Sequence, residues 1–465
     1  MIEKIVKPER PGGFLDLLAS DYLAREKMLK TIENVFRTFG YDPVETPRIE
    51  FLKTLSRETS DTGKNIFHIK SSDDDEMLAL PFDHTVPFAR ILAANPYDSQ
   101  KRTGIRLPWR RMAVGPVFRS DTPQSGRYRQ FYQFDADIAG TASMLADAEI
   151  IAMIFRTMKA LGVERFKIRL NNRKILNGLK TLANIQDRGQ VSADDITQEM
   201  MRILDKLDKS GFEQVEAQLK AEPENPFDAT PNLSDKAVQN IKAFINLKGN
   251  NREKLELCRR IFNRIEIAMQ GIHELEKILV YLKTMEIPEQ YAQIDFSMAR
   301  GLDYYTGPVM ETVLLDAPEF GSVFSGGRYN NLVSRFTGKD LPATGASIGV
   351  DRLFAALDHL KAINRTEQTV AKVIVLRIDK DQDIDYLNIA TRLRKTGINT
   401  ELCLLDDTTF KSQFNFAISR GVRFVIIRGE NERNRQTVQV KNLMTRKQEE
   451  IPEQKLTEYF QTIED

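Results

Sequence analysis

A change of hydrophobic period divides this chain of 465 residues. From residue 172 to about residue 290, almost the whole stretch has the period of an α-helix, and Pro223, Pro226 and Pro231 gather in one polar interruption. Short strand-like segments stand before and after this stretch. We therefore interpret residues 172–290 as a helical insertion into a domain that also contains strands.

The part before the insertion combines helices with strands. Apolar residues recur at three and four positions over residues 24–39, which predicts an amphipathic helix ended by Gly40. The sequence YDPVETP then predicts a strand stopped by Pro47. Helical spacing returns over residues 144–161, and residues 166–170 alternate as a strand.

The part after the insertion contains two different patterns. Strands are predicted at residues 292–298, 309–315 and 346–348, followed by a helix over 351–360. After the linker KAINRTEQTVAK, strands and helices alternate, which predicts a small α/β domain with a largely parallel sheet. The expected division of the chain is 1–171, 172–290, 291–362 and 371–465.

Composition and charge exclude several classes of protein. The 67 basic and 66 acidic residues and the 41% hydrophobic content are typical of a globular chain, not of a disordered or fibrous one. No window is apolar enough for a membrane helix, and the charged first ten residues do not resemble a signal peptide. We expect a cytoplasmic protein, or one of an organelle matrix if a precursor has been trimmed.

Several common sites lack their sequence signals. Cys258 and Cys403 lie far apart without a CxxC, and the four histidines are scattered. The chain has no GxxxxGK[ST], GxGxxG or HExxH. The sequence therefore does not indicate a P-loop nucleotide site, a Rossmann dinucleotide site or a zinc-protease site.

The densest group of charged and aromatic residues is GPVFRSDTPQSGRYRQFYQFDAD, residues 115–137. The alternation in RYRQFYQFD predicts a strand with Arg127, Arg129, Phe131 and Gln133 on one face. Guanidinium groups bind phosphate oxygens in pairs and a flat ring stacks on a base, so this face suits a nucleotide. The alternative is a strand with salt-bridged surface arginines.

Three further segments combine glycines with polar groups. ARGLDYYTG, residues 299–307, offers a cation, an anion and two tyrosine hydroxyls, and its alternative is a tyrosine-rich hairpin edge. GSVFSGGRYNNL predicts a Gly-Gly turn carrying Arg328 and Tyr329. GASIGVDRL, residues 345–353, predicts a strand running into a helix with Arg352 in its first turn.

In order, these segments resemble class II aminoacyl-tRNA synthetases and, within them, the histidyl-tRNA synthetase family. The helix followed by DPVETP resembles motif 1, which forms the family's dimer interface, VFRSDTPQSGRYRQFYQFDADIAG resembles motif 2, and GASIGVDRL resembles motif 3. RGLDYYTG and GGRYNNL resemble the two histidine-binding segments, and the tail with GENERNRQTVQVKNL resembles the anticodon-binding domain. The resemblance spans nearly the whole chain.

The resemblance implies a fold and a reaction. The expected fold is an α+β catalytic domain (1–171 and 291–362) whose antiparallel sheet is flanked by helices, with a helical insertion and a C-terminal α/β anticodon-binding domain. The expected reaction joins histidine to ATP as histidyl-adenylate and transfers it to the 3′ end of histidine tRNA. Because a carboxylate attacks an anionic phosphorus, arginines and the Mg²⁺ that accompanies ATP must balance the charge. The implied assembly is a homodimer without membrane contact.

The resemblance also implies roles for single residues. Arg119 and Arg300 would be catalytic, acting on the α-phosphate from opposite sides. The implied ATP-binding residues are Arg119, Asp121, Arg127, Phe131 and Arg352. The implied histidine-binding residues are Asp83, Thr85, Gln133, Asp137, Arg300, Tyr304 and Tyr305, with the ammonium held by Asp83, Thr85 and Gln133 and the imidazole between Asp137 and Tyr305. Contacts to the tRNA acceptor end are expected at Thr122, Pro123 and Gln124.

Four positions depart from the commonest bacterial pattern. Asp83 and Asp121 stand where glutamate is frequent, and both keep the charge with a shorter reach. Pro81 stands where an arginine is frequent and His84 where a small or aliphatic residue is usual, and residue chemistry explains neither substitution. The alternative function is a non-catalytic paralogue that senses histidine or tRNA, a type of protein that tends to lose the ATP arginines or the tail. This chain has Arg119, Arg300, Arg352 and the tail, which favours the enzyme.

Overall fold

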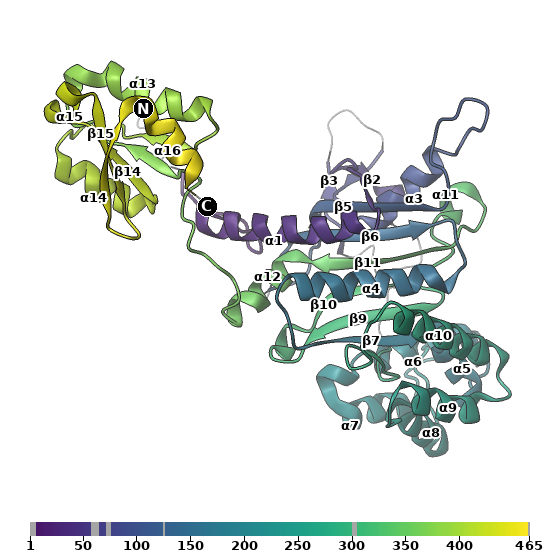
Figure 1. Ribbon diagram of the computed structural model, residues 1–465. Helices are drawn as coiled ribbons and strands as arrows, with labels where there is room; N and C mark the ends of the chain where they lie inside the picture. Colours follow the sequence, from purple (N-terminus) through teal and green to yellow (C-terminus); the bar gives the residue numbers. More distant parts are fainter. Residues whose placement is uncertain (1–5, 57–64, 71–75, 124–125, 300–304, 464–465) are drawn as a thin grey trace. The chain divides into compact units, whose positions relative to one another are not determined.

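The computed structural model describes residues 6–56, 65–70, 76–123, 126–299 and 305–463 (Figure 1). The chain forms two compact units. One contains Met1–Leu15 and Met28–Ala362, and the other contains Asp16–Lys27 and Ile363–Asp465. Within the described residues, no helix combines the length and the apolar character that crossing a membrane requires.

The larger unit is built on an eight-stranded sheet with the order β1-β5-β6-β11-β10-β9-β7-β8. Neighbouring strands are antiparallel except at the two edges, where β1 pairs with β5 and β7 with β8 in parallel. The strands are β1 (Asp42–Pro43), β5 (Trp109–Phe118), β6 (Gln130–Ala139), β7 (Phe166–Asn172), β8 (Ala292–Ile294), β9 (Pro308–Leu314), β10 (Ser322–Tyr329) and β11 (Ala343–Gly349). A small sheet of β2 (Glu50–Phe51), β4 (Leu78–Ala79) and β3 (His68–Ile69) accompanies it.

Helices cover the large sheet. The apolar helix α4 (Met144–Ala160) packs against β6, β7, β10 and β11, and its N-cap Ser143 accepts a hydrogen bond from the backbone N–H of Leu145. Phe36 of α1 (Ala19–Thr38) packs against Phe134 of β6, with ring centroids 4.8 Å apart. The other helices of this part are α2 (Leu52–Leu55), α3 (Thr85–Ala94), the 3-10 helix η2 (Pro318–Phe320), α11 (Ser334–Thr337) and α12 (Val350–His359).

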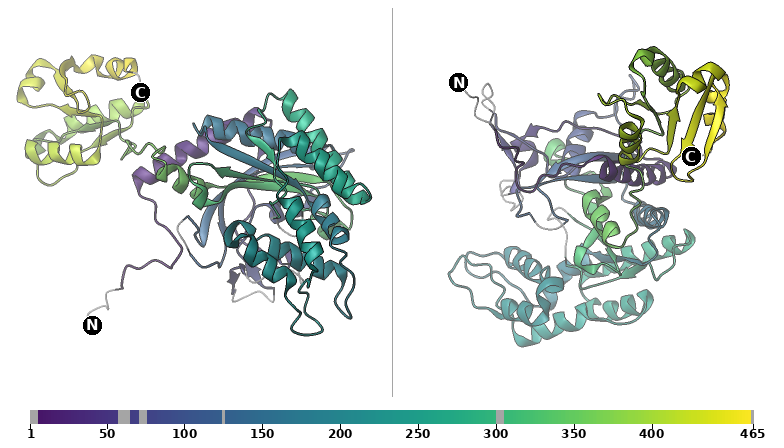
Figure 2. Two further views of the ribbon diagram at one scale, coloured as in Figure 1. Left: turned by 90° about the horizontal axis from the view of Figure 1, so that it is seen from below. Right: turned by 90° about the vertical axis from the view of Figure 1, so that its left-hand side faces the viewer.

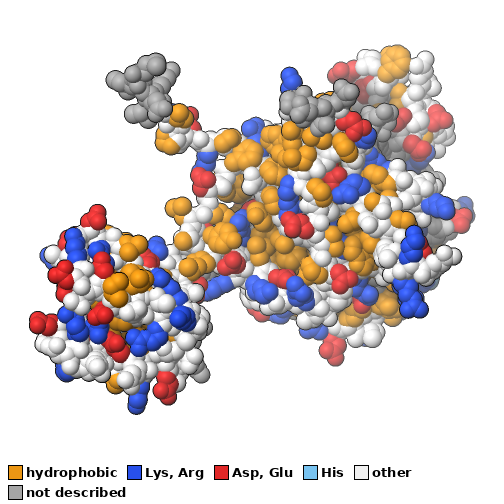
Figure 3. Space-filling view, turned by 90° about the horizontal axis from the view of Figure 1, so that it is seen from above, with side chains coloured by type: hydrophobic (Ala, Val, Ile, Leu, Met, Phe, Trp, Pro, Cys, Tyr) orange, Lys and Arg blue, Asp and Glu red, His pale blue; other side chains and the backbone are white. Residues whose placement is uncertain are grey.

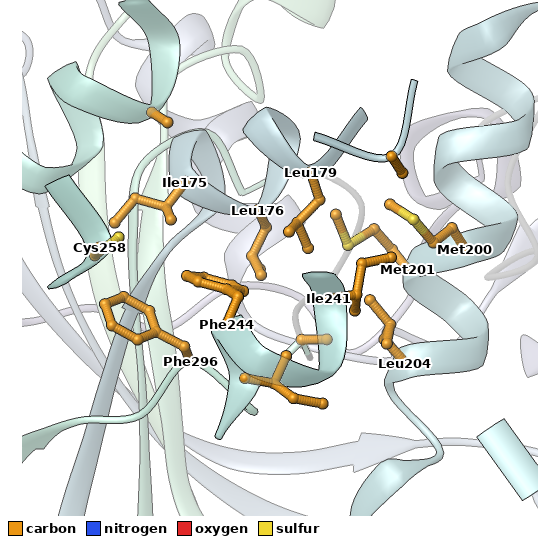
Figure 4. Close-up of a cluster of buried hydrophobic side chains, with 14 of the residues drawn as sticks. Ile175, Leu176, Leu179, Met200, Met201, Leu204, Ile241, Phe244, Cys258 and Phe296 are labelled. Carbon is orange, nitrogen blue, oxygen red and sulfur yellow. The ribbon is translucent and has the colours of Figure 1, made fainter. Parts of the chain in front are cut away.

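Six helices occupy the stretch that the hydrophobic period marked as an insertion, and they have a core of their own. Figure 4 shows side chains from several of these helices, among them Leu176, Met200, Ile241 and Phe244, meeting in one buried cluster. Figures 1 and 2 show the helices gathered beside β7 and β9. They are α5 (Arg173–Leu182), α6 (Ala193–Leu204), α7 (Leu207–Lys220), α8 (Asp235–Ile245), α9 (Asn251–Phe262) and α10 (Glu266–Thr284).

The smaller unit contains a five-stranded sheet with the order β13-β12-β14-β15-β16. The prediction of a largely parallel sheet is wrong for half of it, since β14–β15 and β15–β16 pair antiparallel. Residues 443–447 join β15 to β16 too directly for a parallel crossover. The elements are β12 (Val373–Val375), α13 (Asp383–Lys395), β13 (Thr400–Leu402), α14 (Phe410–Arg420), β14 (Phe424–Ile427), α15 (Glu430–Arg435), β15 (Thr437–Asn442), β16 (Gln448–Pro452) and α16 (Leu456–Thr462).

The expected fold class, an α+β unit with a mainly antiparallel sheet plus a smaller α/β unit, is confirmed. Two local predictions are wrong. Gly326 and Gly327 form no turn but lie inside β10, where a Cβ on Gly326 would collide with the carbonyl oxygen of Gly345. The strand predicted to include Arg127 and Arg129 begins at Gln130, because the backbone N–H of Arg129 donates to Gly13 instead of a sheet neighbour.

Candidate active site

A cavity of about 520 Å³ opens on one face of the large sheet. Successive residues of β6 point to opposite faces, so Gln133, Asp135 and Asp137 line the cavity while Phe134 packs against α1 on the other side. The strands beside β6 add Ser347 and other residues to the same floor. The sheet therefore presents a row of polar side chains to one enclosed space.

Most of the described residues that the resemblance assigned to ATP or histidine meet at this cavity. Although they come from segments far apart in the chain, eight of them line it: Asp83, Thr85, Arg119, Arg127, Gln133, Asp137, Tyr305 and Arg352. Asp121, Thr122, Pro123 and Phe131 are not among its lining residues. Arg300, Tyr304 and Gln124 lie outside the described residues.

Among the residues that the structure describes, three guanidinium groups line the cavity, and each is oriented by a neighbour. Arg119 donates from Nε to the carbonyl oxygen of Phe82 at 3.1 Å, and its Cζ lies 5.1 Å from the centroid of the Phe131 ring. Arg127 forms an ion pair with Asp121 at 2.5 Å. Arg352 donates from Nη1 to the carbonyl oxygen of Ser322 at 2.9 Å. Since arginine stays protonated at any physiological pH, these groups give the cavity a permanent positive region.

Three buried carboxylates form a second region of the same cavity. Asp83, Asp135 and Asp137 are each at most 3% exposed. Burial raises the pKa of Asp83 to about 6, although the backbone N–H of Val86 hydrogen-bonds to it and lowers that pKa. Burial also raises the pKa of Asp137 to about 6 and raises that of Asp135, against the opposing charge of Arg111. A cationic group placed here would replace the water that these carboxylates have lost.

Asp137 is held by two partners behind the cavity. Arg111 on β5 places Nη2 2.7 Å from its Oδ2, and the hydroxyl of Tyr329 donates to its Oδ1. Arg111 also donates to the carbonyl oxygen of His84 at 2.9 Å, and its Cζ lies 4.5 Å from the centroid of the Phe88 ring. The position of this carboxylate is therefore determined by a buried network.

The structure accounts for His84, which residue chemistry left unexplained. Its ring is buried, and Nε2 lies 3.2 Å from the carbonyl oxygen of Gly115. Burial, together with the charge of Arg111, lowers its pKa to about 3, so the neutral ring donates from Nε2. His84 thus joins the start of α3 to β5. The backbone carbonyl of Pro81 accepts a hydrogen bond from the backbone N–H of Phe118, which any residue could do, so this bond does not explain the proline.

Several cavity residues were missed in the sequence. Asp135 and Ser347 were not assigned a role. Every second residue of a strand faces the same side, so the position of Asp135 between Gln133 and Asp137 on β6 could have indicated that it faces the cavity. Arg111 was also missed, because nothing in the sequence shows that it stands opposite Asp137. Conversely, Arg328 of GGRYNNL has its side chain engaged elsewhere, in a buried ion pair with Asp147 of α4.

The described residues contain no group of three or more histidine, cysteine, aspartate or glutamate side chains placed to hold a metal ion. Cys258 and Cys403 are buried and free. Burial raises the pKa of the Cys258 thiol to about 12 and also raises that of Cys403. Both thiols are therefore protonated at neutral pH and poor nucleophiles.

Comparison with known proteins finds relatives along almost the whole chain. Residues 13–353 match the family model described as histidyl-tRNA synthetase, and residues 372–463 match the anticodon binding domain. A histidine--tRNA ligase from Clostridium tetani is 37% identical, with 97% of each chain covered, and one from Ruegeria pomeroyi is 37% identical over 94% of this chain and 90% of that protein. The crystal structure of histidyl-tRNA synthetase from Nostoc sp. PCC 7120 is 30% identical, covers 98% of this chain and 99% of that one, and superposes with a TM-score of 0.81.

Proposed function

Since the chain belongs to the histidyl-tRNA synthetase family and is a histidine--tRNA ligase, we propose that the cavity on β6 and β11 is where it binds histidine and ATP and forms histidyl-adenylate. The single observation that carries this proposal is that, among the described residues, the guanidinium groups of Arg119, Arg127 and Arg352 and the buried carboxylates of Asp83, Asp135 and Asp137 surround one cavity. A triphosphate and an ammonium need these opposite charges side by side.

The guanidinium groups would receive the nucleotide. Arg119 would bind the α-phosphate and the carboxylate of histidine, and Arg300 would act from the opposite side. Arg127, held by Asp121, and Arg352 would bind the β- and γ-phosphates, with the Phe131 ring under the adenine. Mg²⁺ bound with ATP would supply further positive charge to the phosphates. In the transition state these fixed charges stabilise the extra negative charge on the α-phosphorus.

The polar floor of the cavity would select histidine. Asp83, Thr85 and Gln133 would bind its ammonium. Asp137 and Tyr305 would bind its imidazole, whose two nitrogens need one acceptor and one group that can donate, and Tyr304 would be a further histidine-binding residue. A substrate without these groups would leave buried polar atoms unpaired, at about 1–3 kcal/mol for each atom.

We also propose that the enzyme works as a cytoplasmic homodimer with histidine tRNA as its second substrate. The match of residues 372–463 to the anticodon binding domain supports tRNA binding. Thr122 and Pro123 are exposed, which suits contacts to the acceptor end, and Gln124, which lies outside the described residues, would join them. Ile49, Phe51 and Val114 are exposed apolar residues of the larger unit, and Figure 3 shows hydrophobic side chains gathered on one of its faces. Such a face suits a second subunit.

The test is histidine-dependent exchange between ATP and pyrophosphate, followed by charging of histidine tRNA. We expect exchange only when both histidine and Mg²⁺ are present. Binding of histidine without exchange would support the non-catalytic paralogue instead. Family matches over both units of the chain already count against that alternative.

A further inference from the structure

Around Asp83 and the start of β6, within the described part of the chain, three buried acceptor atoms of the cavity have neither a hydrogen bond nor an ion pair, whereas Oδ2 of the nearby Asp137 faces Arg111. They are Oδ2 of Asp83, Oδ2 of Asp135 and Oε1 of Gln133. Their side chains line the cavity and are 3%, 2% and 7% exposed. A buried acceptor without a donor costs free energy, so three of them in one ligand cavity point to a ligand that brings several donors.

The two aspartates are oriented by their other oxygens. Oδ1 of Asp83 accepts from the backbone N–H of Val86 at 3.0 Å, and Oδ1 of Asp135 accepts from the hydroxyl of Ser347. Gln133 and Asp135 are two residues apart on the cavity face of β6, and the charge of Asp135 acts on Asp83. The three open acceptors therefore belong to one neighbourhood with limited freedom to rearrange.

We infer that Asp135 is a further histidine-binding residue and a direct acceptor for the α-ammonium of histidine, beside Asp83 and Gln133. The inference rests on the proposed function and deepens it. An ammonium carries three N–H donors, which matches the number of open acceptors, whereas an imidazolium offers two and a neutral imidazole one. Two carboxylates at the ammonium also make the hydrogen bonds charge-assisted and therefore stronger.

The carboxylate of Asp137, two residues further along β6, differs from that of Asp135 in how much of its charge the protein neutralises. Asp137 already faces Arg111 and the hydroxyl of Tyr329, so its negative charge is partly neutralised by the protein. Asp135 is acted on by the charges of Arg111 and Arg119 and accepts hydrogen bonds from Ser347 and the backbone of His84, while the ion pair of Arg111 is made with Asp137. Asp135 is thus the carboxylate on β6 that gains more from a cation.

Two histidine analogues distinguish a contact with the ammonium from a contact with the imidazole. Histidinol keeps both groups, and imidazolepropionate lacks the ammonium. Their inhibition constants would be measured in the exchange reaction with the wild type, Asp135→Asn and the control Asp316→Asn, which changes a half-exposed aspartate paired with Arg165. In Asp135→Asn we expect histidinol to bind at least about tenfold more weakly while imidazolepropionate changes by less than about twofold. The control should match the wild type for both ligands.

Equal weakening of both ligands, or unchanged binding of histidinol, would overturn the inference, and the first result would move Asp135 to the imidazole. Ser347→Ala supplies a second test, because it keeps the charge of Asp135 but removes the hydroxyl that orients it. We expect a smaller loss, again confined to histidinol; no loss would also overturn the inference. If the wild type neither catalyses exchange nor binds histidinol, the proposed function itself fails.

Discussion

Arg111 and Asp137 stand directly opposite each other on β5 and β6, with Nη2 of the arginine 2.7 Å from Oδ2 of the aspartate. Their side chains are only 2% and 4% exposed. The same guanidinium hydrogen-bonds to the backbone of His84 at the start of α3. One buried cation therefore connects the floor of the cavity to the helix that carries Thr85.

Arg111→Met should destabilise the protein strongly, because it leaves the carboxylate of Asp137 buried without its cation. Breaking a buried ion pair in this way costs about 3–5 kcal/mol of unfolding free energy. The control is Arg110→Met on the same strand, whose partly exposed pair with Glu149 should contribute about 0–1 kcal/mol. Urea unfolding measures the free energy of unfolding of both variants. Equal losses of stability would show that the buried pair of Arg111 and Asp137 contributes no more than the partly exposed pair.

The raised pKa of Asp83 predicts a pH dependence with a definite sign. Its pKa is about 6 in the folded protein against an ordinary aspartate pKa of 3.8, so the folded state binds more protons between about pH 4 and pH 6. The contribution of Asp83 to stability therefore falls as pH rises through this window and is constant above it. His84 has the opposite sign, since its pKa is lowered, but the comparison with Asp83→Asn removes its contribution.

Urea unfolding of the wild type and of Asp83→Asn at several pH values between 4 and 7 measures this effect. We expect the variant to gain stability relative to the wild type as pH rises. A constant difference across the range would mean that the pKa of Asp83 is not raised in the folded protein.

Gly345→Ala should weaken the binding of histidine. A Cβ at this position would lie 2.6 Å from Cγ of Asp137 and 2.7 Å from the carbonyl oxygen of Ala136, so the carboxylate or the strand must move. Gly349→Ala on the same strand is the control, because its nearest neighbour would be Cβ of Arg352 at an ordinary 3.6 Å. The Michaelis constant for histidine in the exchange reaction should rise about tenfold or more in the first variant only.

Arg119→Ala should lower the exchange rate by a factor on the order of 10² to 10³, because a preorganised charge at the α-phosphorus is lost. Arg165→Ala removes an exposed arginine that pairs with Asp316 and should change the rate by less than about twofold. Near-normal exchange by the Arg119 variant would contradict its catalytic role. The thermal unfolding of both variants checks that they remain folded.

Much of the fold was readable from the sequence because it depends on local periodicity. The helical period of residues 172–290 predicted α5 to α10, and the apolar spacing of residues 24–39 predicted most of α1. The glycines at 326 and 327 were misread as a turn, since the contacts that leave no room for a Cβ are made across the sheet, by Gly345 of β11 at Gly326 and by Pro308 of β9 at Gly327. The direction of β15 and β16 likewise depended on pairing and not on local pattern.

The sequence by itself determined which segments could bind a nucleotide and an amino acid, because the residue types in each motif fix which ligand groups that segment can bind. Only the tertiary structure decided which of these side chains share a cavity and which, like Arg328, are taken by a buried partner. Strand register also decided that Asp135 faces the cavity with Gln133 and that Arg111 stands opposite Asp137 on the neighbouring strand. The physical reason is that burial and pairing act through space, so the charge and freedom of a carboxylate depend on neighbours that are remote in the chain.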